Sequence, residues 1–259
     1  MNSFSCQAII IRSIQYGDSD LIINFLTDNM GKISAIAKYA KKSVKRFQGA
    51  LELFNKLNII IKPVKNKNPL ILQEASIIQP FENIRSSIIH TAYASYFAEI
   101  INSWLEEKYD QKATYDLLNN ILEELDKGKI NPNIISILFQ MHFLTITGIK
   151  PNLLTCIKCK RHIDDIKEFE IFFNLKKGSI ICPNCSKKLD NIVLIKKSIK
   201  ELNWISNVDF ETAKRIRPSH ETTINAITFL ENFLPYYLEK QPKSLIFIKN
   251  LRKSKQVKV

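Results

Sequence analysis

Glycine is scarce in this chain, and its scarcity limits the chemistry that the chain can perform. The 259 residues include six glycines, at positions 17, 31, 49, 128, 148 and 178. None are spaced to form a GxGxxG turn or a Walker-type phosphate loop. The sequence therefore excludes nucleotide hydrolysis at a loop of either kind.

Long hydrophobic runs are also missing. An apolar run such as residues 8–11 is far shorter than the roughly 20 residues that cross a membrane as a helix. The N-terminus lacks the basic segment and hydrophobic stretch of a secretory signal. We therefore expect a cytoplasmic protein with no membrane partner.

Acidic residues are outnumbered, with 38 Lys and Arg against 25 Asp and Glu and a net charge of +13. Both ends of the chain are basic and residues 81–147 are acidic, which favours a polyanionic partner. The acidic groups, Asp18 with Asp20 and the cluster at 123–126, suit a turn and a solvated helix face better than a nuclease site. No acid and base pair stands out, and we expect no enzymatic activity and no catalytic residue.

Four of the five cysteines form two CxxC pairs with 22 residues between them. Such spacing is typical of a structural zinc ribbon, in which four thiolates complete a tetrahedral site and leave no open position for chemistry. We predict one structural Zn²⁺ per chain, held by Cys156, Cys159, Cys182 and Cys185. Two disulfides or buried free thiols are the alternatives, and the fifth cysteine, Cys6, is predicted to lie in the core.

Residues 1–79 predict a small barrel. Five segments rich in Ile, Leu and Phe are separated by turn residues, as expected for short strands at 7–14, 21–27, 32–39, 50–62 and 70–78. The loop at 62–69 is basic, and we expect its two prolines to keep it out of the sheet. Five strands in this length indicate an oligonucleotide-binding (OB) fold, whose loops grip a strand of nucleic acid.

The most concentrated basic segment lies between the third and fourth predicted strands. It has five cations in nine residues, no acid, and two interleaved aromatics, Tyr39 and Phe47, which either stack on bases or belong to the core. The alternative is a solvated loop. The predicted nucleic-acid contacts, with those of the next loop, are Lys38, Lys41, Lys42, Lys45, Arg46, Lys65 and Lys67.

From residue 80 the apolar period becomes helical, and residues 80–259 predict an α-helical domain. Helices are expected at about 81–109, 113–125, 132–146, 196–205 and 222–238, followed by a frayed basic tail at 249–258. The zinc ribbon, at about 150–190, reads as an insertion between helices, with residues 169–175 alternating as a strand. The predicted fold class is α+β.

The order of these parts resembles the RecO family of bacterial recombination mediators over nearly the whole chain. The stretch Tyr16-Gly17-Asp18-Ser19-Asp20-Leu21 and the basic segment are similar to the family's N-terminal signature, and Gly148-Ile149-Lys150-Pro151-Asn152-Leu153 is similar to its entry into the first cysteine pair. Tyr39 and Lys160 stand where the family usually or often has glycine.

The resemblance implies a protein that binds single- and double-stranded DNA, anneals complementary strands and acts in recombinational DNA repair near the nucleoid. It implies partnership with RecR to load RecA on strands coated by the single-stranded DNA-binding protein. A zinc-containing RNA-binding or ribosome-associated module is the alternative, and a metal-dependent nuclease is a more distant one.

Overall fold

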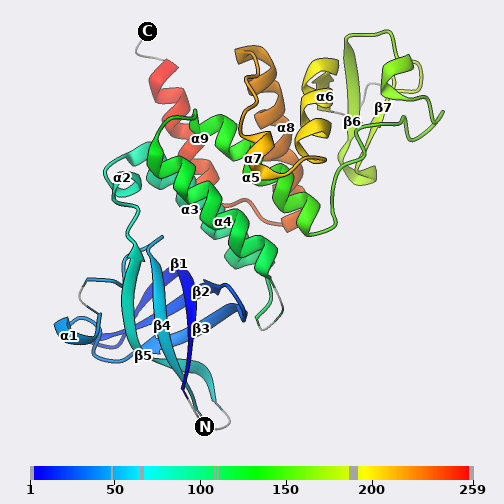
Figure 1. The fold of residues 1–259 in the computed structure, drawn as a ribbon. Coiled ribbons are helices and arrows are strands. Elements are labelled where there is room, and N and C mark those ends of the chain that lie inside the picture. Colours follow the sequence, from blue (N-terminus) through cyan, green and yellow to red (C-terminus); the bar gives the residue numbers. More distant parts are fainter. Residues whose placement is uncertain are drawn as a thin grey trace. The chain divides into compact units, whose positions relative to one another are not determined.

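The computed structural model describes residues 3–47, 49–64, 67–107, 109, 111–186 and 192–256. The chain forms two compact units, one of Met1–Lys129 with Pro242–Val259 and one of Ile130–Gln241. The first unit contains a closed five-stranded barrel and helices, and the second contains helices and a three-stranded sheet (Figure 1). The predicted α+β class, with an N-terminal barrel and a four-cysteine segment among the helices that follow, is confirmed.

The barrel has the strand order β1-β2-β3-β5-β4. Its strands are β1 (Phe4–Tyr16), β2 (Asp20–Thr27), β3 (Gly31–Ala37), β4 (Lys56–Val64) and β5 (Lys67–Gln79). Gly17 and Gly31 take φ values of 59° and 65° in the turns that join the first three strands, a conformation that favours glycine. The parallel pairing of β3 with β5 at Ala35 and Leu70 closes the meander into a barrel.

The barrel interior follows from the two-residue period of its strands. In β3 the buried side chains Ile33, Ala35 and Ala37 alternate with half-buried ones. The other strands contribute Ile10, Phe25, Ile59 and Leu72, among others, to the same core. Cys6 also lies in it, as predicted, and burial raises the pKa of its thiol to about 12.

The predicted start of the fourth strand was wrong, because β4 begins at Lys56 and residues 50–55 form a loop. Phe54 has a φ of 73° there and is buried, and its N–H donates to Ile10 O at 3.0 Å. The loop thus buries apolar residues without pairing as a strand, and hydrophobicity alone does not distinguish the two arrangements.

The prolines of the fourth and fifth strands were also misjudged. Both lie within strands, since β4 continues to Val64 and β5 begins at Lys67. Pro63 stands at a register shift between Lys62 and Val64, a point where the ladder tolerates the missing N–H of proline.

The single helix predicted at 81–109 is two helices, α2 (Glu82–Arg85) and α3 (Ile88–Trp104). Phe81 takes a left-handed backbone before α2, and the Ser87 side chain accepts a hydrogen bond from His90 N at the start of α3. A serine N-cap begins a new helix, so the apolar period continues across a break that periodicity does not reveal.

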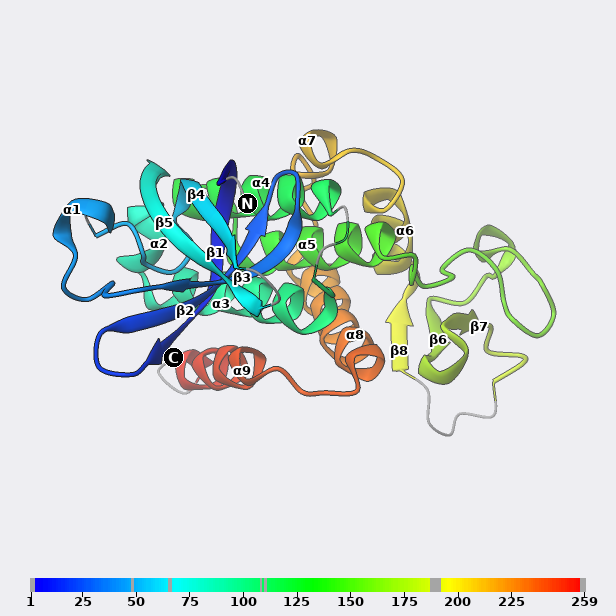
Figure 2. The ribbon, with the colours of Figure 1, turned by 90° about the horizontal axis from the view of Figure 1, so that it is seen from below.

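The first unit is completed by α4 (Lys112–Lys127) and α9 (Lys243–Gln256), both packed against α3 (Figure 2). The C-terminal stretch predicted to fray is therefore helical as far as Gln256. Glu99 of α3 accepts hydrogen bonds from Lys243 N at 3.0 Å and Ser244 N at 2.9 Å, and Arg252 Nη2 donates to Tyr93 Oη at 2.9 Å. These contacts, from residues far away in the sequence, hold both ends of α9.

The described residues of the second unit include four α-helices and a small sheet. The helices are α5 (Pro132–Ile146), α6 (Lys196–Ile205), α7 (Phe210–Ala213) and α8 (His220–Leu238), and the sheet has the order β7-β6-β8, from β6 (Glu170–Asn174), β7 (Ser179–Ile181) and β8 (Ile192–Ile195). Phe173 of β6 contacts Phe229 and Phe233 of α8, with ring centroids 4.7 and 5.6 Å apart. The sheet is therefore anchored to α8, which follows it in the sequence.

Candidate nucleic-acid interface and metal centre

The four paired cysteines converge at one point of the second unit. Their sulfur atoms all lie within 4.8 Å of one another, and the Cys159 and Cys182 Sγ atoms are 3.7 Å apart. Four sulfurs at about 2.3 Å from one tetrahedral ion would be about 3.8 Å apart. The cluster therefore fits a metal ion, and the cysteines are free thiols, which does not support the disulfide alternative.

Each cysteine pair sits in a turn that backbone hydrogen bonds close. Lys160 N donates to Cys156 O at 2.9 Å in the first pair, and Cys185 N donates to Cys182 O at 3.0 Å in the second. Ile157 N, inside the first turn, donates to Ile180 O of β7 at 3.0 Å. The short sheet thus positions both turns, so that a bound ion would join the ends of the ribbon.

The electrostatics of Cys156 favour its thiolate form. Burial raises the pKa of this thiol, but hydrogen bonds from backbone amides, including Cys182 N at 3.4 Å from its sulfur, lower it to about 6. Metal binding requires deprotonated sulfur. The backbone around Cys156 therefore supplies the donors that a metal-bound thiolate needs.

The other candidate ligands and acids are engaged elsewhere. His162 Nδ1 accepts from Asp164 N and lies 3.3 Å from the Asp164 carboxylate. Asp20 Oδ1 accepts from Tyr39 N at 2.8 Å, and Asp126 Oδ1 accepts from Ile84 N at 3.2 Å. In the described part of the chain, the cysteine cluster is the group of potential ligands that converges on a metal position.

The predicted basic segment connects β3 to β4 and includes the single-turn helix α1 (Val44–Phe47). The side chains of Lys38, Lys41 and Lys42 are exposed. Lys41 N donates to Ser19 O at 3.1 Å, so this segment is fastened to the β1–β2 turn. Exposed ammonium groups on a fixed backbone suit contact with phosphates.

Arg46 has a role in the segment that sequence reasoning missed. Its Nη2 donates to Lys38 O at 2.6 Å, its Nε donates to Ser43 Oγ at 2.9 Å, and its guanidinium lies 4.9 Å from the Phe47 ring centroid. These contacts bridge the two ends of the segment. The run of cations in the sequence does not separate this positioning arginine from the free lysines.

The two aromatic residues of the segment differ in exposure. Phe47 is 2% exposed and belongs to the core, whereas Tyr39 is 60% exposed. Only Tyr39 of this pair therefore presents its ring to a ligand.

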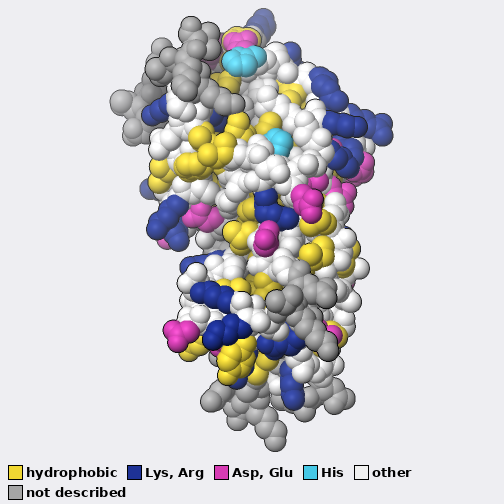
Figure 3. All heavy atoms as spheres, turned by 90° about the vertical axis from the view of Figure 1, so that its left-hand side faces the viewer, with side chains coloured by type: hydrophobic (Ala, Val, Ile, Leu, Met, Phe, Trp, Pro, Cys, Tyr) yellow, Lys and Arg dark blue, Asp and Glu magenta, His cyan; other side chains and the backbone are white. Residues whose placement is uncertain are grey.

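Three of the predicted contact residues lie wholly or partly outside the described part of the chain. Lys65 lies outside the described residues, as do the side chains of Lys45 and Lys67. Figure 3 shows the face of the barrel that carries α1, where Lys and Arg side chains gather around exposed hydrophobic ones. In the second unit, Lys158, Lys160 and Arg161 are exposed beside the first cysteine pair.

Comparison with known families identifies two adjoining matches. Residues 1–81 match the family described as "Recombination protein O N terminal", and residues 85–246 match "Recombination protein O C terminal". The two matches together cover the barrel, the helices from α3 to α8 and the cysteine segment. No helix in the described ranges is long and apolar enough to cross a membrane.

Curated relatives extend over the same length. A protein named "DNA repair protein RecO" from Desulfatibacillum aliphaticivorans is 42% identical over 255 residues, which cover 98% of this chain and 99% of the relative. Its namesake from Desulfosudis oleivorans is 34% identical over 258 residues, 97% of this chain and 99% of the relative. One from Dehalococcoides mccartyi is 28% identical over 253 residues, with 98% of each chain covered.

Proposed function

This chain belongs to the RecO family of DNA repair proteins, and from that premise we propose that it is a non-enzymatic recombination mediator that anneals complementary single strands. The observation that carries the proposal is the fastened basic segment on an N-terminal barrel. The proposed nucleic-acid-binding domain is residues 1–79, and residues 80–259 form the proposed second domain.

Binding is proposed to act through phosphates. Lys38, Lys41 and Lys42 neutralise backbone charge and release counterions, together with Lys45, Lys65 and Lys67, while Arg46 fixes the segment. Contacts of this type set affinity without reading sequence. Complementary strands of any sequence are then equivalent substrates.

Annealing is proposed to follow from two basic regions. The barrel holds one phosphate backbone, and the exposed cations beside the first cysteine pair hold another. Neutralised strands repel each other less, so they pair faster. Base pairing itself supplies the free energy, and neither nucleotide nor magnesium is required.

The metal is proposed to be one structural Zn²⁺ at Cys156, Cys159, Cys182 and Cys185. Four thiolates are a ligand set typical of zinc, and they fill its coordination shell. When bound, the ion cross-links the two turns and does no chemistry. Lys158 Nζ of the first turn donates to Cys185 O of the second at 2.8 Å, so the ribbon also positions this basic side chain.

The proposed partners are single- and double-stranded DNA, RecR, the single-stranded DNA-binding protein and, indirectly, RecA. In this role the protein loads RecA, together with RecR, on coated strands during recombinational repair. It would work in the bacterial cytoplasm at the nucleoid.

The proposal is tested by binding to labelled oligonucleotides in the presence of magnesium. We expect salt-dependent binding of DNA in both forms, with the strands intact after incubation. Cleavage of the DNA would instead indicate a nuclease. Tight and preferential binding of RNA without strand annealing would support an RNA-binding module and overturn the proposal.

A further inference from the structure

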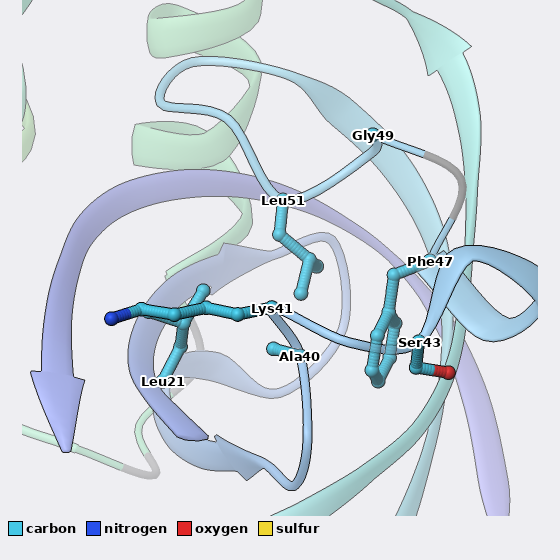
Figure 4. Close-up of a pocket in the computed structure, with 7 residues that line it drawn as sticks. All are labelled: Leu21, Ala40, Lys41, Ser43, Phe47, Gly49 and Leu51. Atoms are coloured by element: carbon cyan, nitrogen blue, oxygen red, sulfur yellow. The ribbon is translucent and has the colours of Figure 1, made fainter. Parts of the chain in front are cut away.

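A hollow of about 260 Å³ opens in the barrel beside the β3–β4 segment (Figure 4). Leu21, Ala40, Phe47 and Leu51 give it apolar walls, and Lys41 and Ser43 are its polar lining residues. This volume is below the roughly 300–1,000 Å³ of sites for drug-sized ligands. The hollow therefore suits one small group.

The walls of the hollow are continuous with the barrel core. Phe47 is part of that core, and Leu21, Ala40 and Leu51 are partly buried and pack against it. In Figure 4 the Leu51 side chain points toward Ala40, whereas the Ser43 hydroxyl points away from them. The inside is therefore apolar, and an occupant is held there by contact rather than by hydrogen bonds.

Positive charge lies along one side of this apolar hollow. The Lys41 side chain runs along one side with its ammonium group at the outer end, and Lys42 and Lys38 are exposed on the same segment. No acidic residue occurs in the sequence between Asp28 and Glu52. An occupant that joins an apolar group to a neighbouring negative charge, as a nucleotide does, is complementary to this arrangement.

We propose that the hollow takes one unstacked base of a single DNA strand while Lys41 contacts a neighbouring phosphate. This inference rests on the proposed function and adds a base-binding subsite to it. Apolar walls make no hydrogen bond with the edge of a base, so the hollow accepts any base without sequence preference.

The subsite gives a physical reason for release of the annealed product. A single strand presents an unstacked base at little cost, whereas a duplex must break a base pair to do so. A strand that has found its complement therefore loses this contact and keeps only the phosphate contacts. The protein binds the single-stranded substrate more tightly than the duplex at equal phosphate contact.

The first test uses the full wild-type chain and two single-stranded oligonucleotides of equal length, one normal and one with all bases replaced by abasic sites. Both carry the same number of phosphates. Removing the bases should weaken binding about 5- to 150-fold, the range expected for loss of one bound base, with an unchanged dependence of log K on log salt. Equal affinities would overturn the proposal.

The second test fills the hollow with Ala40→Leu and uses Ala40→Ser as the matched control that leaves space. The Leu variant should bind the normal strand as weakly as wild type binds the abasic strand, and the Ser variant should bind like wild type. Thermal melting checks the fold of each. A folded Leu variant with wild-type affinity would contradict the proposal, and if that variant does not fold, equal binding of the normal and abasic strands by wild type still overturns it.

The same data separate this inference from the proposed function. If wild type binds neither strand at low salt, the proposed function fails. If it binds both strands equally, the proposed phosphate contacts remain and the base subsite is overturned. Equal binding is also the result expected if the occupant of the hollow is an apolar side chain of a protein.

Discussion

At the residue scale, several non-glycine residues adopt a left-handed backbone that glycine accepts more easily, and two of them lie in the basic segment and the first cysteine turn. Tyr39 and Lys160 have φ values of 53° and 60°, and both stand where RecO sequences usually or often carry glycine. A left-handed conformation costs an L-residue roughly 1–2 kcal/mol. The resemblance to the family therefore has a structural counterpart at both points, because the chain keeps the glycine conformation without the glycine.

We predict that Lys160→Gly stabilises the second unit by about 0.5–1 kcal/mol, since relief of strain exceeds the added entropy of the unfolded chain. The Lys160 N–H to Cys156 O hydrogen bond needs no side chain and is retained. Urea unfolding of the metal-loaded protein measures the change. Lys160→Ala is the control, since alanine keeps the strain, and an equal gain in that variant would show that strain is not the cause.

His142 makes the stability of the second unit depend on pH. Burial lowers the pKa of this imidazole below its usual 6.5, and nearby Asp209 offsets part of that effect. Nε2 is buried without a hydrogen-bond partner among the described residues, and the ring lies 6.0 Å from that of Phe210. Below pH 6.5 the unfolded chain takes up a proton that the folded chain resists, so stability falls with acidification until the lowered pKa is reached.

The variant His142→Phe keeps an aromatic ring beside Phe210 and removes the titration. We predict that its unfolding midpoint changes less than that of wild type between pH 7 and about 5.5. The exposed His220→Gln is the control and should behave as wild type. If the unfolding midpoints of wild type and His142→Phe fall equally as the pH is lowered, His142 is not the source of the pH dependence.

At the element scale, the β3–β4 segment is predicted to supply the salt dependence of DNA binding. Changing Lys38, Lys41 and Lys42 to Ala should weaken binding to all sequences alike and reduce the slope of log K against log salt by about 0.7 per phosphate contact, or about 2 in total on single strands. Fluorescence anisotropy titrations at several salt concentrations give the slope.

The control for this prediction is an equal charge change outside the barrel. Lys127, Lys129 and Lys253 are exposed lysines of the first unit on or after helices, and their triple Ala variant should keep the wild-type slope. The same loss of slope in both triple variants would mean that net charge, rather than the segment, sets the binding.

The cysteine turns are predicted to depend on their metal. Cys182→Ser should lower zinc content well below one ion per chain and lower the melting temperature of the second unit, because a structural zinc contributes directly to folding. Metal analysis and calorimetry measure both. Cys6→Ala destabilises the barrel core but should keep one zinc per chain, and full zinc with unchanged melting in Cys182→Ser would refute the assignment.

The elements differ in how far the sequence predicted them. Helix α6 was predicted with its observed bounds, and the cysteine cluster could be located because CxxC turns are local. By contrast, the break at Ser87 depends on one cap within a continuous apolar period, and α9 is held by Glu99 and Tyr93 from a distant part of the chain. Periodicity reports which face is buried but not which distant element covers it.

The candidate DNA interface also has features that the sequence predicts and features that it does not. The lysines of the basic segment could be chosen by charge density alone, and three of them are exposed. The positioning role of Arg46 could not be predicted, because it depends on the local backbone that brings Lys38 O to the guanidinium. The hollow under Lys41 could not be predicted either, because it requires residues far apart in the sequence, such as Leu21 and Leu51, to be placed together. Contacts of this kind follow from closure of the barrel.

At the scale of the whole molecule, the proposal requires each unit to contribute a basic surface. The exposed lysines of the barrel are in one unit, and the cations beside Cys156 and Cys159 are in the other. Two phosphate backbones held by one chain meet at a high effective concentration with reduced repulsion. A chain with only one functional surface should bind DNA and yet pair strands slowly.

The most direct measurement of this account follows duplex formation between two complementary labelled strands, without nucleotide or magnesium, bare and coated by the single-stranded DNA-binding protein. We predict that wild type accelerates pairing on both substrates and that the Lys38, Lys41 and Lys42 triple Ala variant does so much less. If the protein accelerates pairing of bare strands but not of coated ones, DNA binding is supported and the mediator role is contradicted. Pairing no faster than without protein on either substrate would contradict the account.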